Sequence, residues 1–348
     1  MTTSEYFMLR CFELARKGLG YVAPNPLVGS ILVNNGNIIG EGFHAEYGLD
    51  HAEVNAIRDA EKKYSELVSS SELYVSLEPC SHFGKTPPCS DFIISKGIKK
   101  VYISNTDSNI LVAGKGISKL RSAGIEVVEN LLSDEGRKTN KRFFSFHEKK
   151  RPFIILKWAQ TSDGFIGPIS KEKIQISGNQ SHELVHKWRS EEQAILVGKE
   201  TAITDNPQLN VRLWEGKNPI RVVIDSKLLL PEDLNLFNQN ITTIIFNSIK
   251  DQTENNISFV KLNFKSSILN QLLSYLYSIN IQSIIIEGGT ITLQKFIDEN
   301  LWDEARIFTS PRKINYGIKA PVLSIKNCIE EIIPVSDDKL QIITKTSL

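Results

Sequence analysis

His51-Ala52-Glu53, then Glu78-Pro79-Cys80 and Cys89, form the most informative set of residues in this 348-residue chain. One imidazole and two thiolates are a mixed nitrogen and sulfur donor set that suits zinc, and three protein ligands leave the fourth tetrahedral position for water. We therefore predict a catalytic zinc ion on His51, Cys80 and Cys89. Glu53 lies two residues past the histidine and is a poor fourth ligand, so we expect it to carry protons to and from the metal-bound water.

The spacing of these residues indicates which class of zinc enzyme the chain resembles. H-x-E followed by P-C-x-x-C is the signature of zinc-dependent nucleobase deaminases, and this chain departs from it by placing residues 81–88 between Cys80 and Cys89. A disulfide between the two cysteines is the alternative, and it is disfavoured because nothing in the chain indicates an oxidising compartment. Cys11 and Cys328 are interpreted as packing residues.

Composition excludes several classes of partner. The 41 Lys and Arg residues balance 40 Asp and Glu residues, so the chain lacks the electrostatic footprint of a nucleic-acid-binding or membrane-binding protein. No apolar run is long enough to span a bilayer, and residues 1–5 lack the basic and apolar regions of a signal peptide. We expect a cytoplasmic enzyme that binds a small molecule, with neither nucleic acid nor a membrane as partner.

Apolar periodicity predicts an α/β arrangement in the first half of the chain. Ser4 is the expected N-cap of a first helix that ends near Gly18, and Pro87-Pro88 predicts that another helix begins at Cys89. Zinc ligands would then come from the N-termini of two helices, where the helix dipole favours a thiolate. The other expected elements are a hairpin over 31–39, helices over 51–63 and 115–123, and strands at 73–77, 101–103 and 125–128.

The second half shows the same alternation. Residues 138–151 are basic but carry three phenylalanines, which predicts a packed helix followed by a linker. Glu287-Gly288-Gly289-Thr290 follows an apolar strand and opens a helix. Such a turn can receive a phosphate on its backbone amides or be a tight turn without a ligand, and two glycines do not distinguish these. The expected strands are 153–157, 194–197, 220–224, 242–246 and 283–286, and the expected helices are 180–189, 267–277 and 290–298.

Taken in order, these motifs resemble the bifunctional deaminase–reductase family of riboflavin biosynthesis. The segment Leu77-Glu78-Pro79-Cys80-Ser81-His82-Phe83-Gly84-Lys85-Thr86-Pro87-Pro88-Cys89 is the most specific of them. The second half contributes Ser162-Asp163-Gly164, Asp205-Asn206-Pro207 and Glu287-Gly288-Gly289. The resemblance implies a cytidine-deaminase-like three-layer α/β/α domain over residues 1–147 and a dihydrofolate-reductase-like α/β domain over residues 148–348.

The resemblance also implies the residues of both sites. Substrate on the deaminase side would contact Asn25, His44, His82, Lys85, Thr86, Asp107 and Asn109, with Lys85 as the partner of a phosphate. Substrate on the reductase side would contact Lys157, Lys173, Arg189, Leu209, Arg212 and Glu287. NADPH would contact Ala159, Gln175, Thr201, Asp205, Ser226, Gly289, Thr290, Ile291, Thr292, Leu293, Gln294 and Lys295.

The implied chemistry has two steps. A zinc-dependent hydrolysis removes an amino group from a phosphorylated diaminopyrimidinone, and NADPH then reduces the ribosyl side chain to its ribityl form. The family's D-P-N-P is Asp107-Ser108-Asn109-Ile110 here, and its Ser-x-Trp is Lys173-Ile174-Gln175.

Two other functions are compatible with parts of the pattern. One is a zinc deaminase of another nucleobase or nucleoside whose C-terminal domain is not catalytic. The other is a nucleic-acid-binding or editing protein with structural zinc, which the neutral net charge disfavours. We expect one zinc ion per chain and a homo-oligomer.

Overall fold

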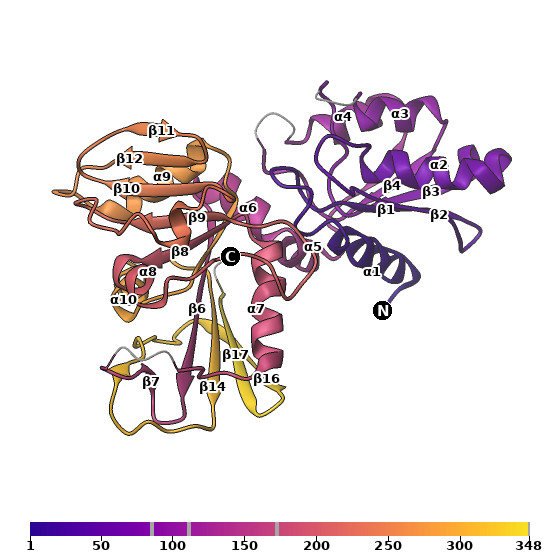
Figure 1. Cartoon of the computed structure of the whole chain (residues 1–348). Helices are drawn as coiled ribbons and strands as arrows, with labels where there is room; N and C mark the ends of the chain where they lie inside the picture. The colour runs from indigo at the N-terminus through magenta and orange to yellow at the C-terminus, as the bar shows by residue number, and fades with distance from the viewer. Residues whose placement is uncertain (84–86, 110–112, 171–173, 347–348) are drawn as a thin grey trace. The chain divides into compact units, whose positions relative to one another are not determined.

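The computed structural model describes residues 1–348 apart from 84–86, 110–112, 171–173 and 347–348 (Figure 1). The chain divides into two compact units, Met1–Lys149 and Lys150–Leu348. Among the described residues, no helix combines the length and the hydropathy that crossing a membrane requires.

The described residues of the first unit build a mixed five-stranded sheet. Strand β1 pairs antiparallel with β2 and β3, and β3, β4 and β5 are parallel. The strands lie in the order β2 (Asn37–Phe43), β1 (Gly29–Asn34), β3 (Glu72–Val75), β4 (Lys100–Ile103) and β5 (Glu126–Val128). The helices are α1 (Thr3–Arg16), α2 (Ala52–Tyr64), α3 (Cys89–Ser95), α4 (Lys115–Ser122), α5 (Ser133–Thr139) and α6 (Lys141–Lys149), with a 3₁₀ turn η1 (Ser65–Ser70).

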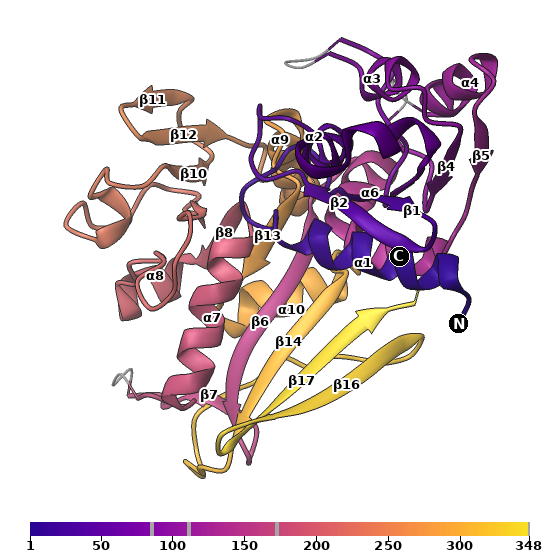
Figure 2. The same ribbon diagram turned by 90° about the vertical axis from the view of Figure 1, so that its right-hand side faces the viewer.

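Helices cover both faces of this sheet, which gives the expected three layers: α1 lies on one side of β1 and β2, and α2 lies on the other (Figures 1 and 2). Glycines allow the close approach on each face. A Cβ on Gly29 would lie 2.0 Å from the carbonyl oxygen of Cys11 in α1, and a Cβ on Gly42 would lie 2.3 Å from the backbone nitrogen of Ala56 in α2. The position of α2 against the sheet matters because the predicted ligand His51 directly precedes it.

The second unit contains a ten-stranded sheet in its described residues. Its strands from β12 to β14 are parallel, so their carboxyl ends share one edge, where α/β sheets bind ligands. The order is β11 (Gln252–Glu254), β12 (Ile257–Lys261), β10 (Thr243–Asn247), β9 (Ile220–Ile224), β8 (Ala194–Gly198), β13 (Ser283–Ile286), β6 (Phe153–Thr161), β14 (Glu304–Ser310), β17 (Asp338–Lys345) and β16 (Cys328–Val335). A separate short ribbon pairs β7 (Phe165–Gly167) with β15 (Ile318–Lys319).

Two apolar clusters bury the two faces of the second sheet. One receives residues of α9 (Ile268–Ser278) and α10 (Thr290–Asp298). The other receives residues of α7 (Asn179–Glu191) and α8 (Lys199–Asp205), and a 3₁₀ turn η2 (Asn235–Phe237) adds Leu236. The strands between them are nearly continuous runs of buried branched residues, as expected for parallel strands covered on both faces.

In the first unit the predicted N-cap was wrong and one helix was not predicted. The N-cap of α1 is Thr2, because Thr2 and Glu5 form a reciprocal capping box that Ser4 does not enter. The helix expected within residues 138–151 is α6, which buries Phe143, Phe144 and Phe146. The preceding helix α5, which ends at Thr139 directly before Asn140, was not predicted. The side-chain amide of Asn140 accepts from the backbone N–H of Leu27 and donates to its carbonyl, both at 2.8 Å. These two hydrogen bonds fix the residue between α5 and α6 to the segment that precedes β1.

Candidate active site

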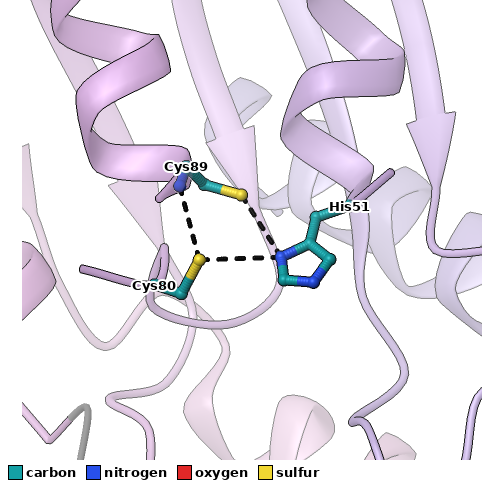
Figure 3. Close-up of side chains that lie close together, drawn as sticks. All are labelled: His51, Cys80 and Cys89. Carbon is teal, nitrogen blue, oxygen red and sulfur yellow. Dashed lines mark hydrogen bonds between the residues drawn. The ribbon is translucent and has the colours of Figure 1, made fainter. Parts of the chain in front are cut away.

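The three predicted zinc ligands converge in the first unit (Figure 3). Their donor atoms all lie within 4.8 Å of one another, and His51 Nδ1 is 3.6 Å from Cys80 Sγ and 3.3 Å from Cys89 Sγ. His51 is the N-cap of α2, and Cys89 is the first residue of α3, so two helix N-termini deliver ligands as expected. Cys80 follows β3. Both cysteines are free, which excludes the disulfide in this structure.

The two thiols are electrostatically unequal. The backbone N–H of Cys89 donates to Cys80 Sγ at 3.3 Å. The Cys89 thiol also donates to Cys80, and this bond together with His51 outweighs burial and lowers the pKa of Cys80 to about 4. The pKa of Cys89 is raised, because it holds the shared proton and is buried. A ready thiolate, a second thiol and an imidazole nitrogen fit zinc.

Glu53 lies in the first turn of α2 with 3% of its surface exposed. Its Oε2 has no hydrogen-bond partner among the described residues. Burial raises the pKa of Glu53 to about 7, against the opposing charge of His51. A buried carboxyl with one oxygen unsatisfied and a pKa near neutrality is suited to accept and return a proton. Within the described residues it is not part of the three-ligand cluster.

A buried ionic cluster marks the second unit. Glu287 follows β13 and accepts two hydrogen bonds of 2.8 Å from the guanidinium of Arg189, while Lys157 Nζ in β6 lies 3.6 Å from the same carboxylate. Arg189 also donates to the carbonyl of Asn210 at 3.2 Å. Burial would raise the pKa of Glu287, but the two cations outweigh it and bring the pKa to about 2. Burial lowers the pKa of Lys157.

The Gly288-Gly289 turn also lies at the carboxyl edge of the sheet. Gly288 has φ +142°, which favours glycine, and the N–H of Gly289 donates to Thr201 Oγ1 at 2.9 Å. A Cβ on Gly198 would lie 2.4 Å from Thr292 Oγ1. The turns after β8 and β13 are therefore packed directly against each other at the N-terminus of α10.

Comparisons with known proteins match both units. Residues 1–105 match the cytidine and deoxycytidylate deaminase zinc-binding region, and residues 152–314 match the RibD C-terminal domain. The riboflavin biosynthesis protein RibD of Aquifex aeolicus is 37% identical over 340 residues, which cover 96% of this chain and 94% of that protein. RibD of Actinobacillus pleuropneumoniae is 38% identical over 325 residues, covering 90% of this chain and 85% of that protein. The chain belongs to the RibD family.

Solved RibD structures agree over the whole chain. A Thermotoga maritima structure described as a diaminohydroxyphosphoribosylaminopyrimidine deaminase/5-amino-6-(5-phosphoribosylamino)uracil reductase is 37% identical, with a TM-score of 0.90 and coverage of 99% of both chains. Acinetobacter baumannii RibD is 30% identical, with a TM-score of 0.88 and coverage of 98% of both. Membership of the RibD family makes this chain a deaminase and reductase of riboflavin biosynthesis, and the alternative of a non-catalytic C-terminal domain is not favoured.

Two residues implied by the RibD resemblance, Asn25 and His44, lie beside the predicted zinc ligand His51. The ring of His44 packs edge-on to His51, with centroids 5.0 Å apart. Asn25 Nδ2 donates to His44 Nε2 at 3.0 Å, and His44 Nδ1 donates to the carbonyl of Asp50 at 3.2 Å. Burial lowers the pKa of His44, so the imidazole is neutral and its tautomer is fixed by these two bonds.

The other residues implied for the deaminase substrate differ in burial, and two of them lie outside the described residues. Asp107 is buried, and burial raises its pKa to about 7 although it accepts from the backbone N–H of Asn109 at 2.6 Å. His82 is exposed. Lys85 and Thr86 lie outside the described residues.

On the reductase side, Lys157 and Arg189 contact Glu287, and the other RibD-implied residues are spread over several elements. Arg212 is exposed and donates to Asn210 Oδ1 at 3.0 Å, and the buried Leu209 precedes them. Lys173 lies outside the described residues. Thr201 and Asp205 lie in α8, Ser226 follows β9 and Ala159 lies in β6. Within α10, Ile291 is 82% exposed whereas the side chain of Leu293 is fully buried in the core. Gln175 bonds to Ser177 and Asn179.

The role of Glu78 was not predicted from the sequence. Glu78 is 4% exposed, and its carboxylate accepts hydrogen bonds from the backbone of residues 107–117. The signal that could have found it is an ionisable residue in the short apolar segment between β3 and Pro79-Cys80.

Proposed function

We propose that residues 1–147 deaminate diaminohydroxyphosphoribosylaminopyrimidine at a zinc ion held by His51, Cys80 and Cys89. The observation that carries this proposal is the convergence of the three donors beside the unsatisfied oxygen of Glu53. The substrate is that of the Thermotoga maritima relative. When bound, zinc supplies a Lewis acid that activates water for hydrolysis.

Glu53 performs the proton transfers of this reaction. Its carboxylate takes a proton from the attacking water and delivers it to the amino nitrogen that leaves as ammonia, which the near-neutral pKa allows in both directions. Asn25 orients the neutral His44 beside the pocket. The buried carboxyl of Asp107 offers a hydrogen-bonding partner for the polar edge of the pyrimidine.

We propose that residues 148–348 then reduce the deaminated product with NADPH, which supplies a hydride for C1′ of the ribosyl side chain. Thr201, Ser226 and Gly289 follow β8, β9 and β13 at the carboxyl edge of the parallel strands, which supports the cofactor site there. Because Arg189 is paired with Glu287 and Asn210, the exposed Arg212 is the better partner for the substrate phosphate.

One assay separates the two activities. The purified protein is incubated with the diaminopyrimidinone phosphate, with and without NADPH, while ammonia and NADPH are followed separately. Ammonia release should not need NADPH, and NADPH should be oxidised only after deamination. The protein should hold about one zinc ion per chain. Failure to bind or oxidise NADPH with the deaminated substrate present would leave only the deaminase. The cytoplasmic location and the homo-oligomer stay predictions.

A further inference from the structure

The carboxylate of Glu78 collects backbone N–H groups from a segment far along the chain. Oε2 accepts from Asp107 at 3.1 Å and from Gly114 at 2.9 Å. Oε1 accepts from Gly116 at 2.8 Å and from Ile117 at 3.2 Å. Buried carboxylates require such partners, and charge-assisted bonds to backbone N–H groups are stronger than neutral ones.

Three of these donors belong to the start of α4. The N-cap of α4 is Gly114, with φ +77°, and it has no side chain to satisfy the free N–H groups of the first turn. Glu78, three residues after β3, supplies the missing acceptor and places a negative charge at the positive end of the helix dipole. The orientation of α4 therefore depends on a residue two positions before the ligand Cys80.

The fourth donor ties down the loop that carries Asp107 and Asn109. The backbone N–H of Glu78 donates to the carbonyl of Asn105 at 2.9 Å, and the Glu78 carboxylate accepts from Asp107. Asp107 in turn accepts from the N–H of Asn109 at 2.6 Å. The start of the loop at Asp107 and its end at Gly114 are thus bonded to one carboxylate. The two stiffening prolines of the family's D-P-N-P are absent from this loop.

A close backbone approach reinforces the junction. A Cβ on Gly116 would lie 1.9 Å from the carbonyl oxygen of Pro79. Only glycine at this position lets the first turn of α4 rest against the residue that precedes Cys80. Asp107, the start of α4 and the residues directly before Cys80 are consequently joined by direct contacts.

We propose that Glu78 is a positioning residue of the deaminase, which sets the distance between the substrate-binding loop at Asp107 and the metal ligand Cys80. This inference rests on the proposed deaminase function. Misplacing a bound substrate by about 1 Å can cost on the order of 10²-fold in rate. A carboxylate that fixes both the loop and the segment of the metal ligand controls that distance without touching the substrate.

Glu78→Gln tests the proposal, because its amide keeps the size but turns an NH₂ group toward two of the N–H donors. We expect about one zinc ion per chain as in the wild type, a raised KM, and a fall of about 10²-fold in deaminase kcat/KM. Glu78→Asp, which keeps both acceptors on a shorter side chain, should restore part of the loss. Gly116→Ala should raise KM in the same way, because it separates α4 from Pro79.

Glu126→Gln in β5 is the matched control, since that side chain is exposed and forms a surface ion pair with Lys100. The kinetics of this variant should match the wild type. Reduction of supplied deaminated substrate should be unchanged in every variant. A Glu78→Gln protein with wild-type KM and kcat, or one whose activity falls only in proportion to lost zinc, would overturn the proposal. A wild type without deaminase activity would instead refute the proposed function.

Discussion

At the scale of single residues, Glu53 has a buried oxygen for which the described part of the chain offers no hydrogen-bond partner, and it lies in the first turn of the helix that follows His51. Replacement by Gln keeps the volume and removes the proton-transferring carboxyl. We expect Glu53→Gln to retain about one zinc ion per chain and to lose deamination by on the order of 10²-fold or more. Metal analysis and ammonia release on the same sample give both values. Loss of zinc in this variant would mean that Glu53 is a ligand.

The Glu287 cluster leads to a prediction about pH. The folded-state pKa of Glu287, about 2, lies below its ordinary value of 4.5. The ionised carboxylate therefore stabilises the folded state fully above pH 4.5, and this contribution is lost as the pH falls toward 2. We expect Glu287→Gln to lower the free energy of unfolding of the second unit by about 3 kcal/mol at pH 7. The deficit should narrow below about pH 4.5.

The four tryptophans, Trp158, Trp188, Trp214 and Trp302, all lie in the second unit, so urea unfolding followed by tryptophan fluorescence measures it selectively. Glu254→Gln is the control, because that side chain is exposed and an exposed ion pair contributes little. A deficit of equal size from pH 7 to pH 3 would show that lost packing, not lost charge, is responsible.

The predictable part of the site was its donor chemistry. Residue types alone indicated His51, Cys80, Cys89 and the separate role of Glu53, because few arrangements of these side chains serve any purpose but metal binding. The positioning role of Glu78 could not be predicted, because its partners are backbone N–H groups between residues 107 and 117. A pattern of side chains does not reveal such partners. The pairing of Arg189 with Glu287 joins residues 98 positions apart and was likewise not visible.

At the scale of elements, α2 begins directly after its N-cap His51 and carries Glu53 in its first turn. The packing of α2 on β2 depends on Gly42. A Cβ at Gly42 would lie 2.3 Å from Ala56 N and 2.5 Å from Ala52 O, so the helix would have to shift. We expect Gly42→Ala to destabilise the first unit by about 1–3 kcal/mol and to weaken zinc binding. Hydrogen exchange of the α2 amides and zinc titration measure the two effects.

Gly167→Ala is the matched control, because a Cβ there meets nothing within 4 Å. The tryptophan-monitored unfolding of the second unit should be the same in Gly42→Ala as in the wild type. Undisturbed exchange of α2 in the variant would contradict the close packing described for this helix.

Elements were predictable where local signals are strong and failed where tertiary contacts decide. The hairpin of β1 and β2 followed from alternation around Asn35-Gly36, and α3 followed from the prolines before Cys89. The break at Asn140 depends on contacts with Leu27 and carries no local signal. Strands β14, β16 and β17 were not predicted, because β16 carries Glu330 and Glu331 among its apolar residues and β14 is too fully buried to alternate.

At the scale of the whole molecule, the two activities are assigned to separate compact units. Removal of zinc with a chelator, or Cys89→Ser, should therefore abolish ammonia release while NADPH-dependent reduction of supplied deaminated substrate continues at the wild-type rate. Adding zinc back should restore deamination to the chelated wild type but not to Cys89→Ser. A parallel loss of reductase activity on chelation would show that the second unit depends on the metal.

The paired bonds between Asn140 and Leu27 have a consequence for biosynthesis of the chain. Leu27 lies two residues after Asn25, which orients His44, and its backbone N–H and carbonyl are both bonded to a side chain 113 positions later. Domains generally fold as units while the ribosome is still adding residues. A nascent chain that stops short of residue 140 already contains all three predicted zinc ligands. Its Leu27 backbone still lacks the two hydrogen bonds to the Asn140 side chain. The segment around Leu27 therefore gains these two hydrogen bonds only after Asn140, between α5 and α6, has left the ribosome.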